Sequence, residues 1–196
     1  MEIKLPRPKT KGNVSLEEAI FKRRSIRKYL SEPISLEELS QILWAAAGVN
    51  SWGKRNYPSA GARYPLEVYA VVGNVEGIKP GIYYYNWREH SLVLVREGDI
   101  RKELYRACLE QECVLNAPVS IVIVAHYERT TSKYGERGIR YVHLDCGHMG
   151  QNIYLQATAL NLGTVAVGAF RDDEVRKVLG VDGDPLYVFP IGKPGE

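Results

Sequence analysis

Hydrophobic positions recur at helical spacing in two segments near the N-terminus. Ser15-Leu16-Glu17-Glu18 and Ser35-Leu36-Glu37-Glu38 both place a glutamate three residues after a serine, the pattern of a capping box. Apolar residues follow each box at intervals of three and four. They predict one helix over about 16–24 and a second from 36 to a stop at Gly48. The next segment, 50–63, has no periodicity and is expected to be a loop.

Runs of β-branched and aromatic residues predict the strands. The expected strands cover 66–72, 119–125, 164–169 and 186–191, and two more, 81–86 and 91–95, form a hairpin. Further helices are expected over 100–111, 139–161 and 172–179. The longest of these, 139–161, is apolar nearly all round and is expected to be a buried central helix. Strands and helices intermix without regular βαβ alternation, which favours an α+β fold. We expect one domain over 15–196, preceded by an N-terminal extension over 1–14.

Composition narrows the class of protein. The chain has 196 residues and a net charge of +3, which is too small to indicate nucleic-acid binding or an anionic membrane surface. No apolar run approaches the roughly 18 residues that span a bilayer, and the first twelve residues have no apolar core typical of a secretory signal. Three cysteines without CxxC spacing indicate free thiols and no zinc site. We therefore expect a cytoplasmic protein without a bound metal.

Two other residue types leave their interpretation open. The 13 tyrosines against three phenylalanines fit polar-lined pockets or interfaces, and fit a dense core equally well. His143 and His148 lie five residues apart and outside any HExxH pattern, so we interpret them as core or interface histidines. No GxSxG or Walker pattern occurs, and the sequence gives no support for hydrolysis or phosphoryl transfer.

A cationic segment is the first candidate for chemistry. In KRRSIRKYL, Lys22 to Leu30, three arginines and Ser25 fall within positions 23–27. A solvated helix end explains such a cluster, since cations are favourable near a helix C-terminus. A phosphate site also explains it: Arg23 and Arg27 would share a face if the helix continued, and guanidinium forks fit phosphate oxygens. The residues alone leave both interpretations open.

Three further segments carry weaker signals. The loop PSAGARYP at 58–65 has small residues that let a flat ligand approach the backbone. GTVAVG at 163–168 lacks GxGxxG and follows a helix, so it is not a Rossmann site. GKPG at 192–195 follows a strand and holds Lys193.

Taken together, these segments resemble the nitroreductase-like FMN oxidoreductases, and most closely the branch called SagB-type dehydrogenases. The matching stretches are RRSIRKY at 23–29, SAGARYPLEVY at 59–69, LDCGHMGQNIYLQATALNLGTVAVGAF at 144–170 and FPIGKP at 189–194. They occur in the family's order and cover nearly the whole chain, from about residue 15 to 194.

The resemblance implies a site made largely of backbone and cations. It assigns the FMN phosphate and ribityl chain to Arg23, Arg24, Ser25 and Arg27, and the phosphate side also to Gly192 and Lys193. The loop that comes from the second subunit and lies against the flavin corresponds to Pro58, Ser59, Ala60 and Gly61. The stretch facing the isoalloxazine ring corresponds to Val165, Ala166, Val167 and Gly168, with the amide of Val167 or Gly168 directed at flavin N5. Polar positions of the core helix, near the cofactor or the dimer interface, correspond to Gln151 and Asn152. No side chain is assigned a catalytic role.

The implied fold is a mixed sheet flanked by helices, with a long central helix, assembled as an intertwined homodimer with FMN at the interface. The implied activity is electron transfer from NADH or NADPH through FMN to a small organic acceptor such as a nitroaromatic or quinone, with ping-pong kinetics. Two alternatives stay open: a SagB-like dehydrogenase that oxidises azolines in a modified peptide with a Tyr and Lys pair as base, and a non-catalytic FMN carrier. Many relatives carry a C-terminal extension around the partner subunit, whereas this chain stops two residues after Pro194. For the azoline-oxidising alternative, Lys133-Tyr134 is an adjacent Lys and Tyr pair that could act as the base, and the sequence does not place it at the flavin.

Overall fold

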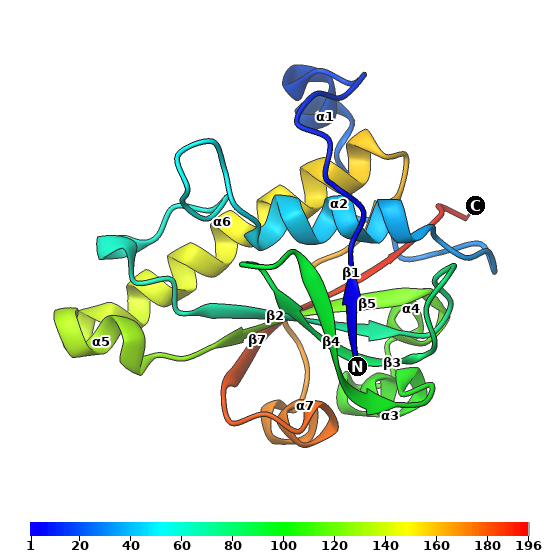
Figure 1. The fold of residues 1–196 in the computed structure, drawn as a ribbon. Helices are drawn as coiled ribbons and strands as arrows, with labels where there is room; N and C mark the ends of the chain where they lie inside the picture. The colour runs from blue at the N-terminus through cyan, green and yellow to red at the C-terminus, as the bar shows by residue number, and fades with distance from the viewer. Residues whose placement is uncertain (196) are drawn as a thin grey trace.

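A seven-stranded sheet forms the centre of the protein, in a computed structural model that describes residues 1–195 (Figure 1). The strand order is β1-β4-β3-β2-β5-β7-β6, and all the pairs formed between these strands are antiparallel. The strands are β1 (Glu2–Lys4), β2 (Leu66–Val72), β3 (Gly81–Asn86), β4 (Ser91–Glu97), β5 (Val119–Ala125), β6 (Gly163–Thr164) and β7 (Asp184–Gly192). With helices on both faces of this sheet, the predicted α+β class is confirmed. The sheet itself is antiparallel rather than mixed as expected.

The two central strands are buried on both faces, as their unbroken apolar runs predict. In β2, Val68 and Ala70 face one core and Tyr69 and Val71 face the other, because successive side chains of a strand point to opposite sides. The sheet therefore divides the interior into two cores. Helices α2 (Leu36–Ala47) and α6 (Arg137–Ala159) cover the first, and α3 (Arg101–Ala107), α4 (Glu112–Asn116) and α7 (Asp172–Leu179) cover the second (Figure 1).

The long central helix and the capped helix before it are both present. The expectation that the long helix is buried nearly all round is wrong, because α6 is buried along one face and leaves residues such as Ile139 and Leu144 exposed. Helix α6 is 23 residues long and packs against α2. Helix α2 begins with a complete capping box, in which Ser35 and Glu38 each accept a bond from the other's backbone amide. The first helix, α1 (Leu16–Lys22), has only half of a box, because the Glu18 carboxylate pairs with Lys22 rather than with the backbone of Ser15.

Two predicted elements differ from the structure. The helix expected over 100–111 ends early, at Ala107, as α3, because Leu109 and Glu110 turn the chain with φ of 58° and 57°. Helix α4 begins beyond the predicted range, at Glu112, and was not expected. The strand expected over 164–169 is reduced to β6 and one isolated bridge between Val167 and Val188, because Pro190, opposite Val165 in this register, has no N–H to continue the ladder. A further helix, α5 (Glu128–Tyr134), was not expected, since its sequence ERTTSKY has no apolar periodicity.

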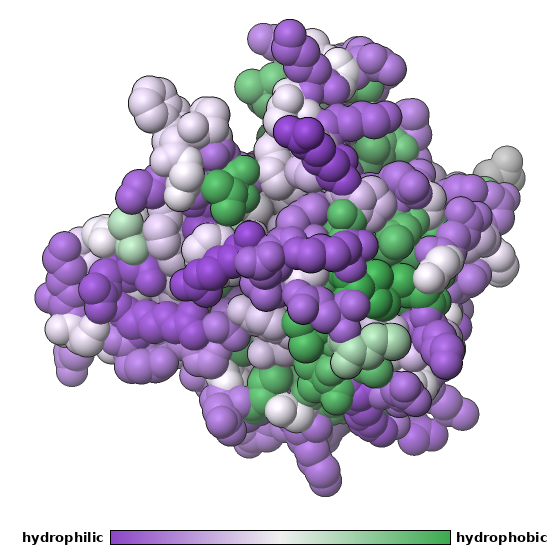
Figure 2. Space-filling model, in the orientation of Figure 1, coloured by the Kyte–Doolittle hydropathy of each residue, from purple (hydrophilic) through white to green (hydrophobic). Residues whose placement is uncertain are grey.

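The N-terminal segment lies against the body of the protein. Strand β1 pairs with β4 at the edge of the sheet, and Leu5 donates to the carbonyl of His90 at 3.1 Å. Figure 2 shows this face as largely hydrophilic, with hydrophobic residues gathered beside β1. Between residues 1 and 195, no helix has the length and apolar character needed to cross a bilayer.

Candidate functional site

The cationic segment leaves the helix and runs beside β6 and β7. Helix α1 ends at Lys22, and Arg23 is already extended, with φ −56° and ψ 127°. The helix does not continue past Lys22, so Arg23 and Arg27 do not share a helical face. The amide of Ile26 instead donates to the carbonyl of Thr164 at 2.8 Å, which holds the segment against the edge strand β6.

Three guanidinium groups of this segment have no anionic partner in the part of the chain that the structure describes. Among residues 1–195, no carboxylate forms an ion pair with Arg23, Arg24 or Arg27. Arg23 lies over the ring of Tyr154, 5.1 Å from its centroid. Arginine donors that lack internal acceptors are available to an anion such as a phosphate.

Lys193 lies next to this segment. Its carbonyl accepts a bond from the amide of Leu30 at 2.9 Å, and its ammonium group pairs with Glu32 at 2.9 Å. The hydrogen bond to Glu32 raises the pKa of Lys193. An anion bound by this lysine would therefore compete with a carboxylate, whereas no described carboxylate competes for the three arginines.

Tyr154, on α6, joins the cationic segment to the stretch 165–168. Its hydroxyl is 2.9 Å from Oγ of Ser25 and accepts the amide of Ala166 at 2.8 Å. Its ring packs edge-on against Phe189 of β7, with centroids 5.8 Å apart. No spacing in the sequence distinguishes this tyrosine from the others, and sequence reasoning gave it no role.

One of the two predicted flavin-facing amides is already used within the chain. Val167 donates to the carbonyl of Val188 at 2.8 Å, and Val188 donates back at 3.0 Å. Val165 and Val167 are buried, whereas Gly168 is exposed. The amide of Gly168 has no acceptor in the described part of the chain. Of the two candidates, Gly168 is the amide that an external ligand can reach.

The loop at 58–61 lies farther along α6. Ser59 donates to the carboxylate of Asp145 at 2.6 Å, and burial raises the pKa of this carboxyl. Asp145 precedes Tyr154 by nine residues, or about 14 Å along the helix axis at 1.5 Å per residue. Within one chain the structure thus keeps two groups of candidate residues apart: the loop, and the cationic segment with the stretch 165–168.

The pair Lys133-Tyr134 lies beside this loop. Gly61 has a φ of 59°, and a Cβ added to it would lie 2.5 Å from the hydroxyl of Tyr134 and 3.1 Å from Nζ of Lys133. Two polar groups capable of proton transfer therefore border the loop, a placement that sequence spacing does not reveal.

The two polar candidates of α6, Asn152 and Gln151, differ in their contacts. Asn152 donates to the carbonyls of Ala45 and Asn56 at 3.0 and 3.1 Å, which ties α6 to α2 and to the following loop. Gln151 is exposed, and its side chain makes no hydrogen bond among the described residues. The structure thus gives Asn152 an internal role and leaves Gln151 open to a partner.

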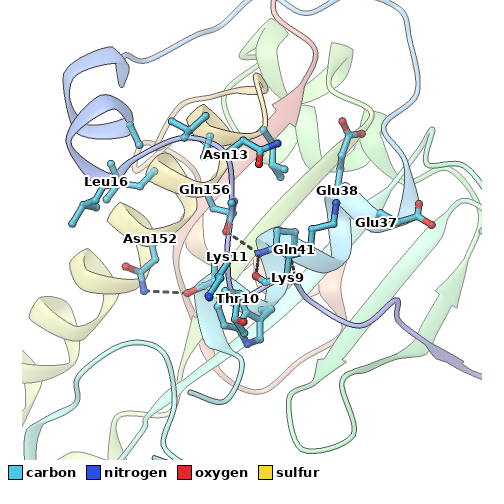
Figure 3. Close-up of a pocket in the computed structure, with 18 of the residues that line it drawn as sticks. Lys9, Thr10, Lys11, Asn13, Leu16, Glu37, Glu38, Gln41, Asn152 and Gln156 are labelled. Atoms are coloured by element: carbon cyan, nitrogen blue, oxygen red, sulfur yellow. Dashed lines mark hydrogen bonds between the residues drawn. The ribbon is translucent and has the colours of Figure 1, made fainter. Parts of the chain in front are cut away.

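A groove of about 760 Å³ lies between the N-terminal segment, α2 and α6 (Figure 3). Gln41 crosses it, bonding both backbone groups of Lys9 and reaching Gln156 at 3.1 Å. Of the predicted flavin-binding residues, only Asn152 lines this groove. The groove is therefore separate from the cationic segment.

The antiparallel sheet, the central helix and the cation-rich site with an accessible amide are consistent with a flavin-dependent oxidoreductase. The chain belongs to the Nitroreductase family, whose pattern matches residues 20–193. It is 47% identical over 194 residues to a nitroreductase homologue of Methanocaldococcus jannaschii, covering 98% of this chain and 96% of the relative. The family prediction is confirmed.

Two further relatives show the breadth of this family. The chain is 32% identical over 170 residues to the trifolitoxin-processing protein TfxB of Rhizobium leguminosarum bv. trifolii, covering 78% of this chain and 45% of TfxB. A crystal structure of a nitroreductase homologue from Anabaena variabilis superposes with a TM-score of 0.88 at 32% identity, over 100% of this chain and 42% of the other. The chain thus spans less than half the length of both proteins. TfxB supports the predicted likeness to the SagB-type branch.

Proposed function

We propose that this protein is an FMN-dependent oxidoreductase that passes electrons from NADH or NADPH to a small organic acceptor such as a nitroaromatic or a quinone. The observation that carries this proposal is the connection through Tyr154. Its hydroxyl links a segment whose three arginines pair with no carboxylate among residues 1–195 to the stretch that ends in the exposed amide of Gly168. A phosphate-bearing aromatic ligand needs cations at one end and backbone donors at the other, and this arrangement supplies both.

The phosphate end is assigned to the cationic segment. Arg23, Arg24 and Arg27 are permanently charged, and their planar donors fit the oxygens of a dianionic phosphate. Ser25 adds a hydroxyl, and Gly192 and Lys193 border the same segment. These residues would bind and orient the phosphate and ribityl chain and would take no part in electron transfer.

The ring end is assigned to backbone. FMN, when bound, would supply the hydride chemistry. The amide of Gly168 would donate a hydrogen bond to the ring and stabilise negative charge on it, without any side chain. Tyr154 and Val188 hold the amides of Ala166 and Val167, and so fix the direction in which the next amide points.

A second copy of the chain would complete the site. Leu16, Ile20 and Phe21 of α1 are 62%, 55% and 89% exposed, an apolar surface on a helix whose only buried residue is Ala19. We propose that a homodimer in the cytoplasm covers this surface. In the dimer, Pro58, Ser59, Ala60 and Gly61 of one chain would lie against the flavin held by the other.

The test begins with the purified protein. We expect stoichiometric FMN, with a visible flavin spectrum that bleaches anaerobically on addition of NADH or NADPH. Arg23→Gln with Arg27→Gln should weaken FMN binding by at least tenfold, whereas Arg106→Gln should not. Arg106 is the matched control, because it is an exposed arginine of α3 and is not among the residues assigned to the phosphate end. A colourless protein that does not take up FMN would contradict the proposal.

A second candidate function is dehydrogenation of azoline rings in a modified peptide. Two observations favour it: the similarity to the trifolitoxin-processing protein, and the position of Lys133 and Tyr134 beside Gly61. Such a reaction removes a hydride and a proton from the ring, and the Lys and Tyr pair would take the proton. FMN that is bound, is not bleached by NADH or NADPH and is reduced by an azoline peptide would favour this function over the first. Bound FMN that no donor reduces would indicate a carrier.

A further inference from the structure

Arg55 is a buried cation that forms no ion pair within the described residues. It is 5% exposed, and among residues 1–195 no carboxylate pairs with it. Glu67, the carboxylate that acts on it electrostatically, is itself bound to Arg129. Desolvation lowers the pKa of Arg55, so burial of this charge is unfavourable.

The guanidinium group is held by one carbonyl and three aromatic rings. Nε donates to the carbonyl of Ala47, at the end of α2, at 2.6 Å. The central carbon of the guanidinium lies 4.5 Å from the ring centroid of Trp87, 5.4 Å from that of Tyr57 and 5.9 Å from that of Tyr64. Arg55 thus connects α2, the β3–β4 turn and two tyrosines that are close in sequence.

These two tyrosines are the ends of the loop that contains 58–61. Tyr57 immediately precedes Pro58, and Tyr64 closes the loop with its amide bonded to Oγ of Ser59 at 3.0 Å. The two rings also pack edge-on, 5.6 Å apart. Arg55 therefore contacts both ends of the loop, while Asp145 binds its middle through Ser59.

The loop needs such support because its backbone is strained. Ala62 and Tyr64 have φ of 52° and 47°, in the left-handed region that residues with a side chain rarely adopt. Conformations of this kind persist only where surrounding contacts enforce them. The rings of Tyr57 and Tyr64 are placed to provide that enforcement, and Arg55 fixes both rings.

We propose that Arg55 is a positioning residue that holds the strained loop 58–64 in one conformation, through Tyr57 and Tyr64. An apolar side chain of similar volume could fill this space without the desolvation cost of a charge. The guanidinium additionally fixes the orientation of its neighbours, because it bonds the carbonyl of Ala47 and stacks on several rings at the same time. The consequence for flavin binding rests on the proposed function, in which this loop lies against the flavin of the partner subunit.

The test compares Arg55→Met with Arg88→Met. Arg88 is the matched control, because it also stacks on Trp87, at 4.3 Å, and is exposed without contacting either tyrosine. Amide hydrogen exchange should become at least tenfold faster at Ala62, Arg63 and Tyr64 in Arg55→Met and stay unchanged in Arg88→Met. Thermal unfolding of Arg55→Met should stay within the range of the control.

Each outcome decides the proposal. Unchanged exchange in the loop would overturn it, because Arg55 would then not restrain these amides. Unfolding of Arg55→Met would also overturn it, since the guanidinium would then serve the whole fold. Faster exchange with an intact fold supports it, and a weaker affinity for FMN in that variant alone would extend it to the site. Exchange is measured without flavin, so a wild-type protein that fails to bind FMN would contradict the proposed function and leave the role of Arg55 standing.

Discussion

Replacement of Tyr154 by phenylalanine removes one hydroxyl and leaves the ring in place. The edge-on contact with Phe189 and the stacking of Arg23 use the ring, so both should persist. Two hydrogen bonds disappear: the 2.8 Å bond from the amide of Ala166 and the 2.9 Å contact with Ser25. The two losses differ in cost, because the two partners differ in exposure.

The amide of Ala166 carries most of the cost. Ser25 is exposed and can turn to water, whereas Ala166 is half-buried and its N–H loses its acceptor. An unsatisfied buried donor costs about 1–3 kcal/mol, and partial access to water places this one at about 1.5 kcal/mol. For a chain of this length, a loss of that size lowers the midpoint of thermal unfolding by about 3–6 °C.

Urea unfolding and thermal scans of the wild type and Tyr154→Phe measure this loss. Tyr105→Phe is the control, because its hydroxyl bonds Glu112 at 3.2 Å on the surface and should change the free energy of unfolding by less than about 0.5 kcal/mol. If Tyr154→Phe were as stable as Tyr105→Phe, the hydroxyl would not hold the amide of Ala166. The account of how the Gly168 amide is directed would then be refuted.

Two further substitutions test the packing and charge around α6. Burial raises the pKa of Asp145 above its ordinary 3.8, so the folded state binds this proton more tightly than the unfolded state does. The contribution of the carboxyl to stability therefore declines as pH rises from 3.8 through the raised pKa. Asp145→Asn should remove that decline, and urea unfolding of both proteins over a pH series would give parallel curves if the carboxyl were not perturbed. Gly150→Ala should cost about 1–3 kcal/mol, because the new Cβ would lie 2.8 Å from the ring of Phe189. Gly147→Ala meets no atom within 4 Å and should gain up to about 1 kcal/mol, so equal effects in denaturant unfolding would contradict this packing.

The sequence pattern correctly predicted two kinds of element: strands that are buried on both faces, and helices that end at a signal in their own sequence. Strands 66–72 and 119–125 are found with the predicted bounds, because side chains buried on both faces leave an unbroken apolar run. Helix 172–179 is also found with its predicted bounds, since Gly180 ends it in the left-handed conformation. The strand at 164–169 was wrong beyond Thr164, because Pro190 of β7 has no N–H to donate to Val165 opposite it.

The sequence allowed us to name segments of the candidate site. It did not allow us to predict the side-chain contacts that join and support them. Family resemblance named the cationic segment and the stretch 165–168, and those residue assignments stay predictions. Tyr154, which joins them, and Arg55, which supports the loop, lie in stretches where tyrosine and arginine are common and have no distinctive spacing. Their roles depend on which rings and amides the fold brings together, so only the structure reveals them.

The geometry of α6 explains why one chain would not complete the proposed flavin site. The helix holds the loop 58–61 through Asp145 and the cationic segment through Tyr154, about 14 Å apart along its axis. A helix that rigidly separates two halves of a site cannot bring them together by bending. In a symmetric dimer, however, each interface patch of one chain meets a different patch of the other, and both halves are used twice. The spacing along α6 would then set the distance between the two flavins, and each flavin would be bound by one chain and covered by the other.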